Sequence, residues 1–158
     1  MSDGYRTKGD GNGFKLGGEG LPVKHVLRNS LAFNNEIFGV SSNSNPAIIV
    51  ENTTSVDNGR ANFNFANYPN ATPQFVAKNN ISFRTKPGAA DVLPDMLLSA
   101  NNYFYNGSHS QNNKGVKLSA KDFKSVTLKP FVRNRDGSIA PNDFMQVVNR
   151  SLKSGFRY

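Results

Sequence analysis

The sequence predicts an all-β protein, a parallel β-helix (solenoid) of about three coils that ends in a C-terminal cap. Three observations predict this fold. Similar segments recur about every 24 residues, as in one β-helix coil. Their apolar residues are mostly β-branched or aromatic, types that favour a pleated surface. Asparagine, which tolerates the left-handed conformation of tight turns, occurs 22 times in 158 residues.

The repeat is defined by three segments that align without gaps, 25–35, 48–58 and 75–85. Each has an asparagine at its fifth position and a bulky apolar residue at its ninth. The asparagines are Asn29, Asn52 and Asn79, and the apolar residues are Phe33, Val56 and Phe83. Equivalent strands of successive coils pair in a β-helix. We therefore expect the asparagines to stack inside a turn with buried amides, and the apolar residues to form an internal ladder.

A second strand in each coil is predicted by shorter segments, 13–16, 39–42 and 62–65, which lie between the longer ones or before them. Within these segments apolar and polar residues alternate, as in a strand with one face inward. A leucine-rich horseshoe has a similar period, but the leucine positions that it needs are missing.

After Pro87 the repeat breaks down. We predict a short helical or irregular excursion over 90–98, a last degenerate strand over 98–105 and a polar loop over 111–115. Short helical or capping pieces are predicted over 119–128 and 143–152. The whole, 1–158, is interpreted as a single truncated β-helix domain whose N-terminal coils are missing, with repeating coils in 1–86 and the last irregular coil and C-terminal cap in 87–158. A solenoid needs caps because its open ends expose core and strand edges.

The net charge of +8 favours an anionic partner, which could be nucleic acid, an anionic lipid surface or an acidic polysaccharide. Nucleic acid is disfavoured because no known binding motif occurs and the aromatic residues fall at predicted inward positions. A membrane partner is disfavoured because no apolar stretch reaches the length of a transmembrane helix. The polar, glycine-rich segment 1–10 does not resemble a signal peptide, and the absence of cysteine excludes disulfides.

The densest motif is Gly9-Asp-Gly-Asn-Gly-Phe-Lys15-Leu-Gly-Gly18. It lacks the third glycine of a dinucleotide fingerprint, the Gly-Lys-Ser/Thr of a P-loop and the later ligands of a calcium loop. What remains is a short strand whose alternation places Phe14 and Leu16 inward and Lys15 outward. The flanking glycines would let a large ligand approach the backbone. The alternative is a solvated lysine on an exposed strand.

This motif, followed by segment 25–35, resembles the family 9 polysaccharide lyases. The pectate lyases of that family are right-handed parallel β-helix enzymes that cleave polygalacturonate by β-elimination. The segments 120–125, 133–138 and 142–144 resemble the part that closes those domains. The resemblance covers essentially the whole chain. It implies a right-handed β-helix, an acidic polysaccharide (polygalacturonate) as partner and an extracellular location for the parent enzyme.

By this resemblance Lys15 matches the family's Brønsted base, which takes the proton α to a uronate carboxylate. The family also uses calcium, bound by aspartates on a rung that precedes the lysine, to stabilise the charge that develops. Here the 11 carboxylates are scattered, and only Asp10 and Glu19 lie near Lys15 in sequence. We therefore predict no metal ligands in this chain, with calcium a cofactor only of the intact enzyme.

The rung alignment places Ser41, Asn43 and Asn64 beside Lys15 on the outward face, where they would bind sugar hydroxyls or carboxylates. Their alternative is ordinary solvated turn residues. The two histidines, His25 and His109, have no partner pattern and are predicted to be structural or surface residues.

We interpret the chain as a truncated pectate lyase that is inactive or nearly so alone. The alternative is a non-catalytic β-helix module that binds an acidic polysaccharide, and nucleic-acid binding, motivated by charge alone, ranks last. Because the first coil has no cap, we expect upstream coils or another chain to cover the N-terminal end.

Overall fold

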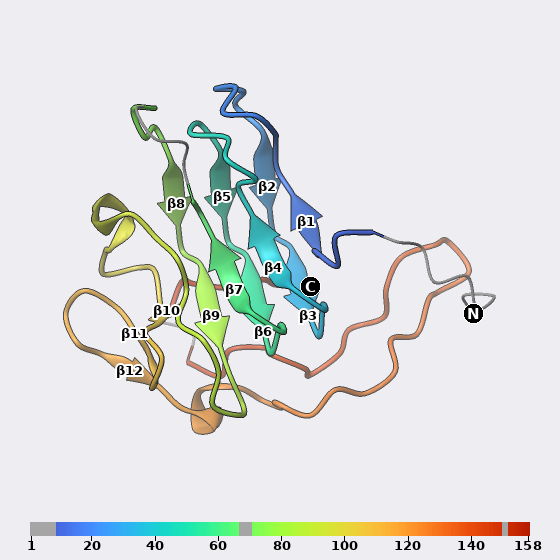
Figure 1. Ribbon diagram of the computed structural model, residues 1–158. Helices are drawn as coiled ribbons and strands as arrows, with labels where there is room; N and C mark the ends of the chain where they lie inside the picture. The colour runs from blue at the N-terminus through green and yellow to red at the C-terminus, as the bar shows by residue number, and fades with distance from the viewer. Residues whose placement is uncertain (1–8, 67–70, 150–151) are drawn as a thin grey trace.

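The computed structural model describes residues 9–66, 71–149 and 152–158, and it shows a stack of β-helix coils (Figure 1). Nine strands form three parallel sheets, with the orders β1-β4-β7, β2-β5-β8 and β3-β6-β9. The chain visits the three sheets in turn, and each circuit is one coil. The bounds are β1 (Phe14–Lys15), β2 (Val26–Arg28), β3 (Leu31–Phe33), β4 (Phe38–Ser41), β5 (Ile49–Glu51), β6 (Thr54–Val56), β7 (Ala61–Asn64), β8 (Val76–Lys78) and β9 (Ile81–Phe83). The predicted parallel β-helix of about three coils is confirmed.

The register of the strands reproduces the gapless alignment of the repeat. Val26 pairs with Ile49, and Ile49 pairs with Val76. In the next sheet Phe33 pairs with Val56 and then Phe83, and in the first sheet Phe14 pairs with Val40 and then Phe63. Every one of these residues stands at an equivalent position in the aligned segments, so the alignment was correct to the residue.

The prediction that the fifth-position asparagines have buried amides is wrong. Asn29, Asn52 and Asn79 have φ values of 45°, 48° and 56°, so each turns the corner between two strands in the left-handed conformation. That backbone directs their side chains outward, where Asn29 is exposed and the other two are half-buried. Asn79 Nδ2 does donate to Asn52 Oδ1 at 3.1 Å, but Asn29 instead bonds the backbone of Arg157.

The buried amides belong to the next position along the chain. Asn80, fully buried, accepts from the Thr53 amide at 3.0 Å and donates to the Val50 carbonyl at 2.9 Å. Asn102 repeats this arrangement one coil further, because its Oδ1 accepts from the amide of Asn80 at 2.9 Å. An amide has both a donor and an acceptor, so each one joins two coils through otherwise unpaired backbone groups.

The ninth-position residues form a ladder, but not inside the coil. The interior side chains of those strands are the small residues Ala32, Ser55 and Ser82, and Asn62 inside the coil donates to the Ser82 hydroxyl at 3.0 Å. The ladder lies on the outer face, where C-terminal aromatic rings cover it. Its ring contacts are Phe33 with Phe144, 5.6 Å between centres, and Phe83 with Phe123, 4.9 Å. The coil interior is filled by residues such as Val40, Val50, Phe63 and Phe65.

Beyond β9 the chain adds a partial fourth coil and then a cap. Val92 bridges to Asn64 and Tyr103 to Ile81, and the short 3₁₀ helix η1 (Asp95–Leu97) occupies the predicted excursion. An antiparallel sheet follows, β10 (Phe104–Tyr105), β11 (Ser110–Gln111) and β12 (Lys117–Leu118). A second 3₁₀ turn, η2 (Ala120–Asp122), is closed by a capping box from Ser119.

Of the two alternatives predicted for 143–152, helical or capping, the helical one is wrong for the residues of that stretch that the structure describes. Phe144 and Val147 make isolated β-bridges to Ser125 and Phe123 instead. From there the chain returns along the side of the solenoid, beneath β9, β6 and β3 in Figure 1. In the described ranges no helix is long and apolar enough to cross a membrane.

A strap of four residues ends this return and crosses all the coils. Its hydrogen bonds run from Ser154 Oγ to the Asn101 carbonyl, from Gly155 N to the Asn79 carbonyl, from Phe156 N to Thr54 Oγ1 and from Arg157 N to Asn29 Oδ1, at 2.6 to 3.0 Å. Each partner lies one coil nearer the N-terminal end than the last. The strap therefore ties the corner between the second and third sheets along its whole length.

Asp91 fastens the fourth coil to the third. Its carboxylate accepts from the backbone amides of Phe63 and Tyr105, both at 2.9 Å. Burial raises the pKa of Asp91 to about 6, although hydrogen bonds from Ser82 and the two amides act in the opposite direction. Because this pKa lies above the value of 3.8 for a free carboxyl, the folded protein binds a proton that the unfolded chain releases.

We therefore expect Asp91 to make the fold more stable as the pH falls through 6. Between about pH 7.5 and about pH 5 the free energy of unfolding should rise by about 1 kcal/mol from this group. Urea unfolding at both pH values measures it, with Asp91→Asn as the control that cannot titrate. A stability difference between the two proteins that stays constant with pH would contradict this assignment.

Candidate functional site

Lys15 projects outward from the first strand of the solenoid. Its neighbour Phe14 packs against the interior core, so alternation turns the lysine toward solvent, with 44% of its side chain exposed. Lys15 pairs with Ser41, and Ser41 pairs with Asn64. The three residues therefore form one row across β1, β4 and β7, as the alignment predicted.

The ammonium group of Lys15 forms an ion pair with the carboxylate of Asp10. Hydrogen bonding and the charge of Lys15 hold the pKa of Asp10 below its usual value. Both side chains are largely exposed, so the pair is weak and exchanges readily with solvent. Lys15 can act as a base only after it has left Asp10.

The glycines around β1 are explained by the neighbouring coil, rather than by the approach of a ligand. A Cβ atom on Gly17, whose φ is +142°, would lie 2.4 Å from the Cβ of Asn45. A Cβ on Gly13 would lie 2.7 Å from the carbonyl oxygen of Gly39. Asn45 needs this space because its buried amide donates to the carbonyls of Leu16 and Val23. Gly18 has more room, because a Cβ there would meet Asn43 Nδ2 at 3.5 Å, an ordinary contact.

The three predicted substrate-binding residues differ in how accessible they are. Asn64 is half-buried at the outer surface of β7. Ser41 is 3% exposed, and its hydroxyl accepts from the amide of Asn43 at 3.1 Å. Asn43 lies beyond the end of β4, where its side chain donates to the Gly17 carbonyl. Ser41 is therefore enclosed, whereas Lys15, Asn43 and Asn64 reach the surface, and the assignment of all four residues stays a prediction.

The described residues do not provide a set of calcium ligands. No group of three or more histidine, aspartate or glutamate side chains converges in residues 9–66, 71–149 and 152–158. Calcium prefers six to eight oxygen ligands, whereas Lys15 faces the single carboxylate of Asp10. Ligands for a calcium ion beside Lys15 would have to come from elsewhere.

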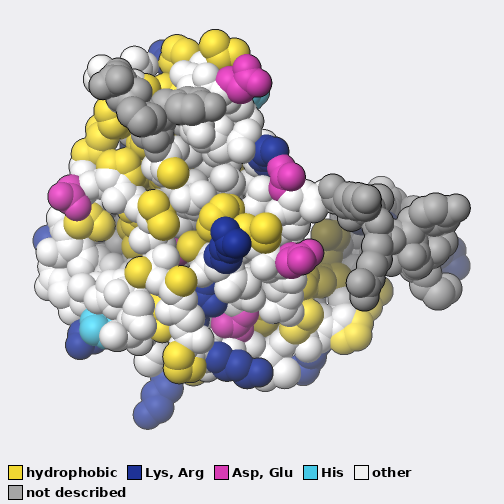
Figure 2. Space-filling view, viewed as in Figure 1, with side chains coloured by type: hydrophobic (Ala, Val, Ile, Leu, Met, Phe, Trp, Pro, Cys, Tyr) yellow, Lys and Arg dark blue, Asp and Glu magenta, His cyan; other side chains and the backbone are white. Residues whose placement is uncertain are grey.

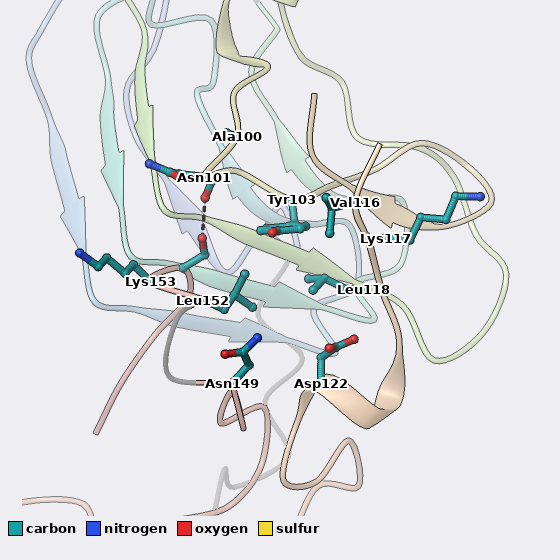
Figure 3. A pocket seen from close by; sticks show the side chains of 11 residues that line it. Ala100, Asn101, Tyr103, Val116, Lys117, Leu118, Asp122, Asn149, Leu152 and Lys153 are labelled. Carbon is teal, nitrogen blue, oxygen red and sulfur yellow. Dashed lines mark hydrogen bonds between the residues drawn. The ribbon is translucent and has the colours of Figure 1, made fainter. Parts of the chain in front are cut away.

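Several pockets open on the described part of the molecule. One of about 490 Å³ begins two residues after Lys15 and is lined by Gly17, Gly18, Glu19, Leu21, Val23 and His25. Another of about 300 Å³ is shown in Figure 3, where the side chains of Tyr103, Leu118 and Leu152 converge and Lys117 and Lys153 extend away from it. Asp122 at its edge is engaged by the amide and hydroxyl of Ser119, as the capping box requires. No nucleophile and base are brought together there.

A cluster of basic residues near the turn after β9 was not predicted. Arg84, Lys86 and His109 line one pocket, although the sequence separates the histidine from the other two by more than 20 positions. Figure 2 shows lysine and arginine side chains along the lower edge of this face, the side on which that turn lies. The chain brings His109 to this pocket when it returns through β10 and β11, and no local sequence pattern predicts that approach.

Three stacked coils with a lysine in an outward polar row define a parallel β-helix protein whose candidate site is the surface around Lys15. More particularly, the chain belongs to the Pel9A-like right-handed β-helix family, since the family model described as "Pel9A-like, right handed beta helix region" matches residues 1–82.

Curated relatives agree with this assignment. A pectate lyase L of Paenibacillus polymyxa is 40% identical over 153 residues, which is 95% of this chain and 32% of that protein. A pectate lyase L of Thermoclostridium stercorarium is 41% identical over 123 residues, 78% of this chain and 10% of that protein. A pectate disaccharide-lyase of Dickeya chrysanthemi is 48% identical over 96 residues, which is 59% of this chain and 13% of that protein. The chain thus spans a third or less of these relatives, and no solved structure matches it significantly.

Proposed function

We propose that this chain is the part of a pectate lyase that carries the catalytic base, Lys15, and that the intact protein cleaves polygalacturonate by calcium-assisted β-elimination. The single observation that carries the proposal is the position of Lys15. It is an outward lysine on a core-anchored strand, in register with Ser41 and Asn64, in a chain 40% identical to a pectate lyase L.

The chemistry asks two things of the protein. Lys15, in its neutral form, takes the proton α to the carboxylate of a uronate unit, and the bond from the β carbon to the glycosidic oxygen breaks to leave an unsaturated uronide. The glycosidic oxygen leaves with the electron pair of that bond and takes a proton from water. Negative charge builds up on the uronate carboxylate meanwhile and needs a positive group beside it. The described neighbours of Lys15 offer the carboxylate of Asp10, which has the wrong sign.

We therefore expect the purified chain alone to form little or no product. Ultraviolet absorbance of the unsaturated uronide, on polygalacturonate with and without calcium, measures this. A calcium-dependent rise that Lys15→Ala abolishes would contradict the expected inactivity and would reveal metal ligands outside the described ranges.

In a longer protein that contains this segment and preceding coils, Lys15→Ala should lower product formation by about 10²- to 10⁴-fold, the usual contribution of a positioned general base. Lys24→Gln, which removes one exposed positive charge on the same coil, is the matched control and should change the rate little. Equal rates in the Lys15 variant and the parent would reject Lys15 as the base.

A non-catalytic module that binds an acidic polysaccharide is the second candidate. The ion pair of Lys15 with Asp10 favours it, because a lysine engaged by a carboxylate is not available to remove a proton. Affinity for polygalacturonate that survives both a chelator and Lys15→Ala would support binding without catalysis.

The proposal also includes an extracellular location for the intact protein, because its polymeric substrate lies outside cells.

The proposal further includes a partner that covers the N-terminal coil. The strands β1, β2 and β3 are the outer strands of their sheets, and Leu21 and Val26 nearby are 62% and 49% exposed. Upstream coils or another chain would pair with these edges and bury the apolar side chains.

A further inference from the structure

A basic pocket of about 230 Å³ lies between the turn after β9 and the loop from β10 to β11. Its polar walls are Arg84, Thr85, Lys86, Ser108, His109 and Ser110. The lining includes three basic side chains and no carboxylate, in a protein whose net charge is +8. A concave surface lined by one sign of charge concentrates ions of the opposite sign.

Arg84 is held in place at this pocket while part of its hydrogen-bonding capacity stays unused. One of its terminal nitrogens donates to the Arg60 carbonyl at 2.8 Å, and its guanidinium lies over the Tyr105 ring, 5.7 Å from the centre. Its Nε atom is buried and has no hydrogen-bond partner. The guanidinium is therefore oriented in advance, and a fixed guanidinium loses little conformational entropy when it binds an oxyanion.

A second polar group without a partner lies in the same wall. Ser110 is 2% exposed, and its hydroxyl has no hydrogen-bond partner. A buried donor without a partner costs free energy that a ligand can recover. His109 completes the wall, with its Nε2 held 2.8 Å from Oε1 of Gln111. Two residues that line this small pocket therefore each carry a buried polar atom without a partner, which favours a site for a ligand with several acceptor oxygens.

The acidic groups nearest the pocket are already engaged. Asp57 accepts from the amide and the hydroxyl of Thr85, at 2.8 and 2.6 Å. Asp91 accepts from two backbone amides on the other side of Arg84, and the arginine's charge helps to lower its pKa against the effect of burial. Neither carboxylate lines this pocket, although Asp57 lines a neighbouring pocket together with Arg84, Thr85 and Lys86.

We propose that this pocket binds a carboxylate of an acidic polysaccharide, at a second contact point distinct from Lys15. The identity of the anion as a uronate rests on the proposed function. The chemistry fits because Arg84 offers a planar set of donors, Lys86 a mobile charge and the serines hydroxyl groups for a sugar. Along the solenoid axis Lys15, in β1, and the pocket, after β9, are separated by two to three rungs, roughly 10–15 Å, and the pocket also lies around the coil from the row of Lys15.

The test is a titration of the isotopically labelled full chain with trigalacturonate, followed by amide NMR. We expect shifts at Thr85, Lys86 and Ser108 to Ser110. The double variant Arg84→Gln/Lys86→Gln should weaken this binding at least about tenfold, as the loss of charge-assisted hydrogen bonds predicts. The matched control Lys114→Gln/Lys129→Gln removes the same charge from exposed positions elsewhere and should change the affinity by less than about twofold.

Additional ligands and variants separate the outcomes. His109→Gln, which leaves Arg84 in place, should also weaken binding. This variant keeps the inference testable if the arginine variant fails to fold. Trigalacturonate methyl ester should not bind the pocket, and inorganic phosphate at the same concentration should not displace the acid. Shifts with phosphate alone would overturn the uronate assignment. Shifts near Lys15 but not at the pocket would overturn this inference and leave the proposed function standing, whereas shifts at neither place would overturn both.

Discussion

Replacing Asn80 by alanine is expected to lower the free energy of unfolding by about 3 kcal/mol, because a fully buried amide that joins three backbone or side-chain groups would be lost. The Thr53 amide and the Val50 carbonyl would both be left buried without partners. The bond to Asn102 would be lost as well. Urea unfolding followed by circular dichroism measures the change.

The neighbouring residue supplies the control. Asn79 is half-buried and its side chain bonds only the Asn52 side chain, so Asn79→Gly should cost less than about 1 kcal/mol while retaining the left-handed turn. Equal losses in the two variants would mean that the corner, rather than the buried amide ladder, determines stability.

The comparison of Asn79 with Asn80 also shows what the sequence could predict. The period and the register were predictable because equivalent residues of successive coils must pair. A gapless alignment of the repeats therefore predicts which residues pair between neighbouring strands. The side on which each side chain falls was not predictable at the corner. A single residue in the left-handed conformation, such as Asn52 with φ of 48°, reverses the inward and outward alternation for the strand that follows.

That reversal explains the misplaced ladder of Phe33, Val56 and Phe83. An apolar residue on the outer face of a coil is stable only if something covers it, and the cover is Phe123 and Phe144, far along the chain. The tail was predicted as an end cap from its position in the sequence. Its actual path along the side of the solenoid depends on contacts that no local pattern encodes.

The candidate site likewise has features that local or periodic signals predict and features that depend on long-range contacts. Lys15 and its row with Ser41 and Asn64 followed from strand alternation and from the repeat, which are local or periodic signals. The glycines of the motif were attributed to ligand access, yet Gly17 is required by the Asn45 side chain of the next coil. The basic pocket depends on a long-range approach of His109 to Arg84, which a single sequence does not reveal.

Removing residues 154–158 is expected to destabilise the fold by about 4 kcal/mol, since hydrogen bonds to every coil are lost together at typically about 1 kcal/mol each. The strap also covers Ile81, which is fully buried and lies 2.8 Å from the position of a Cβ on Gly155. In a solenoid each coil contacts only its neighbours, so stability is a sum of local terms. A segment that contacts all the coils at once adds a term that couples distant coils.

This coupling makes the second effect of the truncation more informative than the first. Without the strap, the unfolding transition should become broader as well as lower, because the N-terminal coil, open on one side, can separate from the rest independently. Arg157→Ala is the control, since the bonds to Asn29 use the backbone of Arg157 and survive the substitution. A truncated protein that unfolds at a lower denaturant concentration with an unchanged slope would show that the strap adds stability without joining the coils into one cooperative unit.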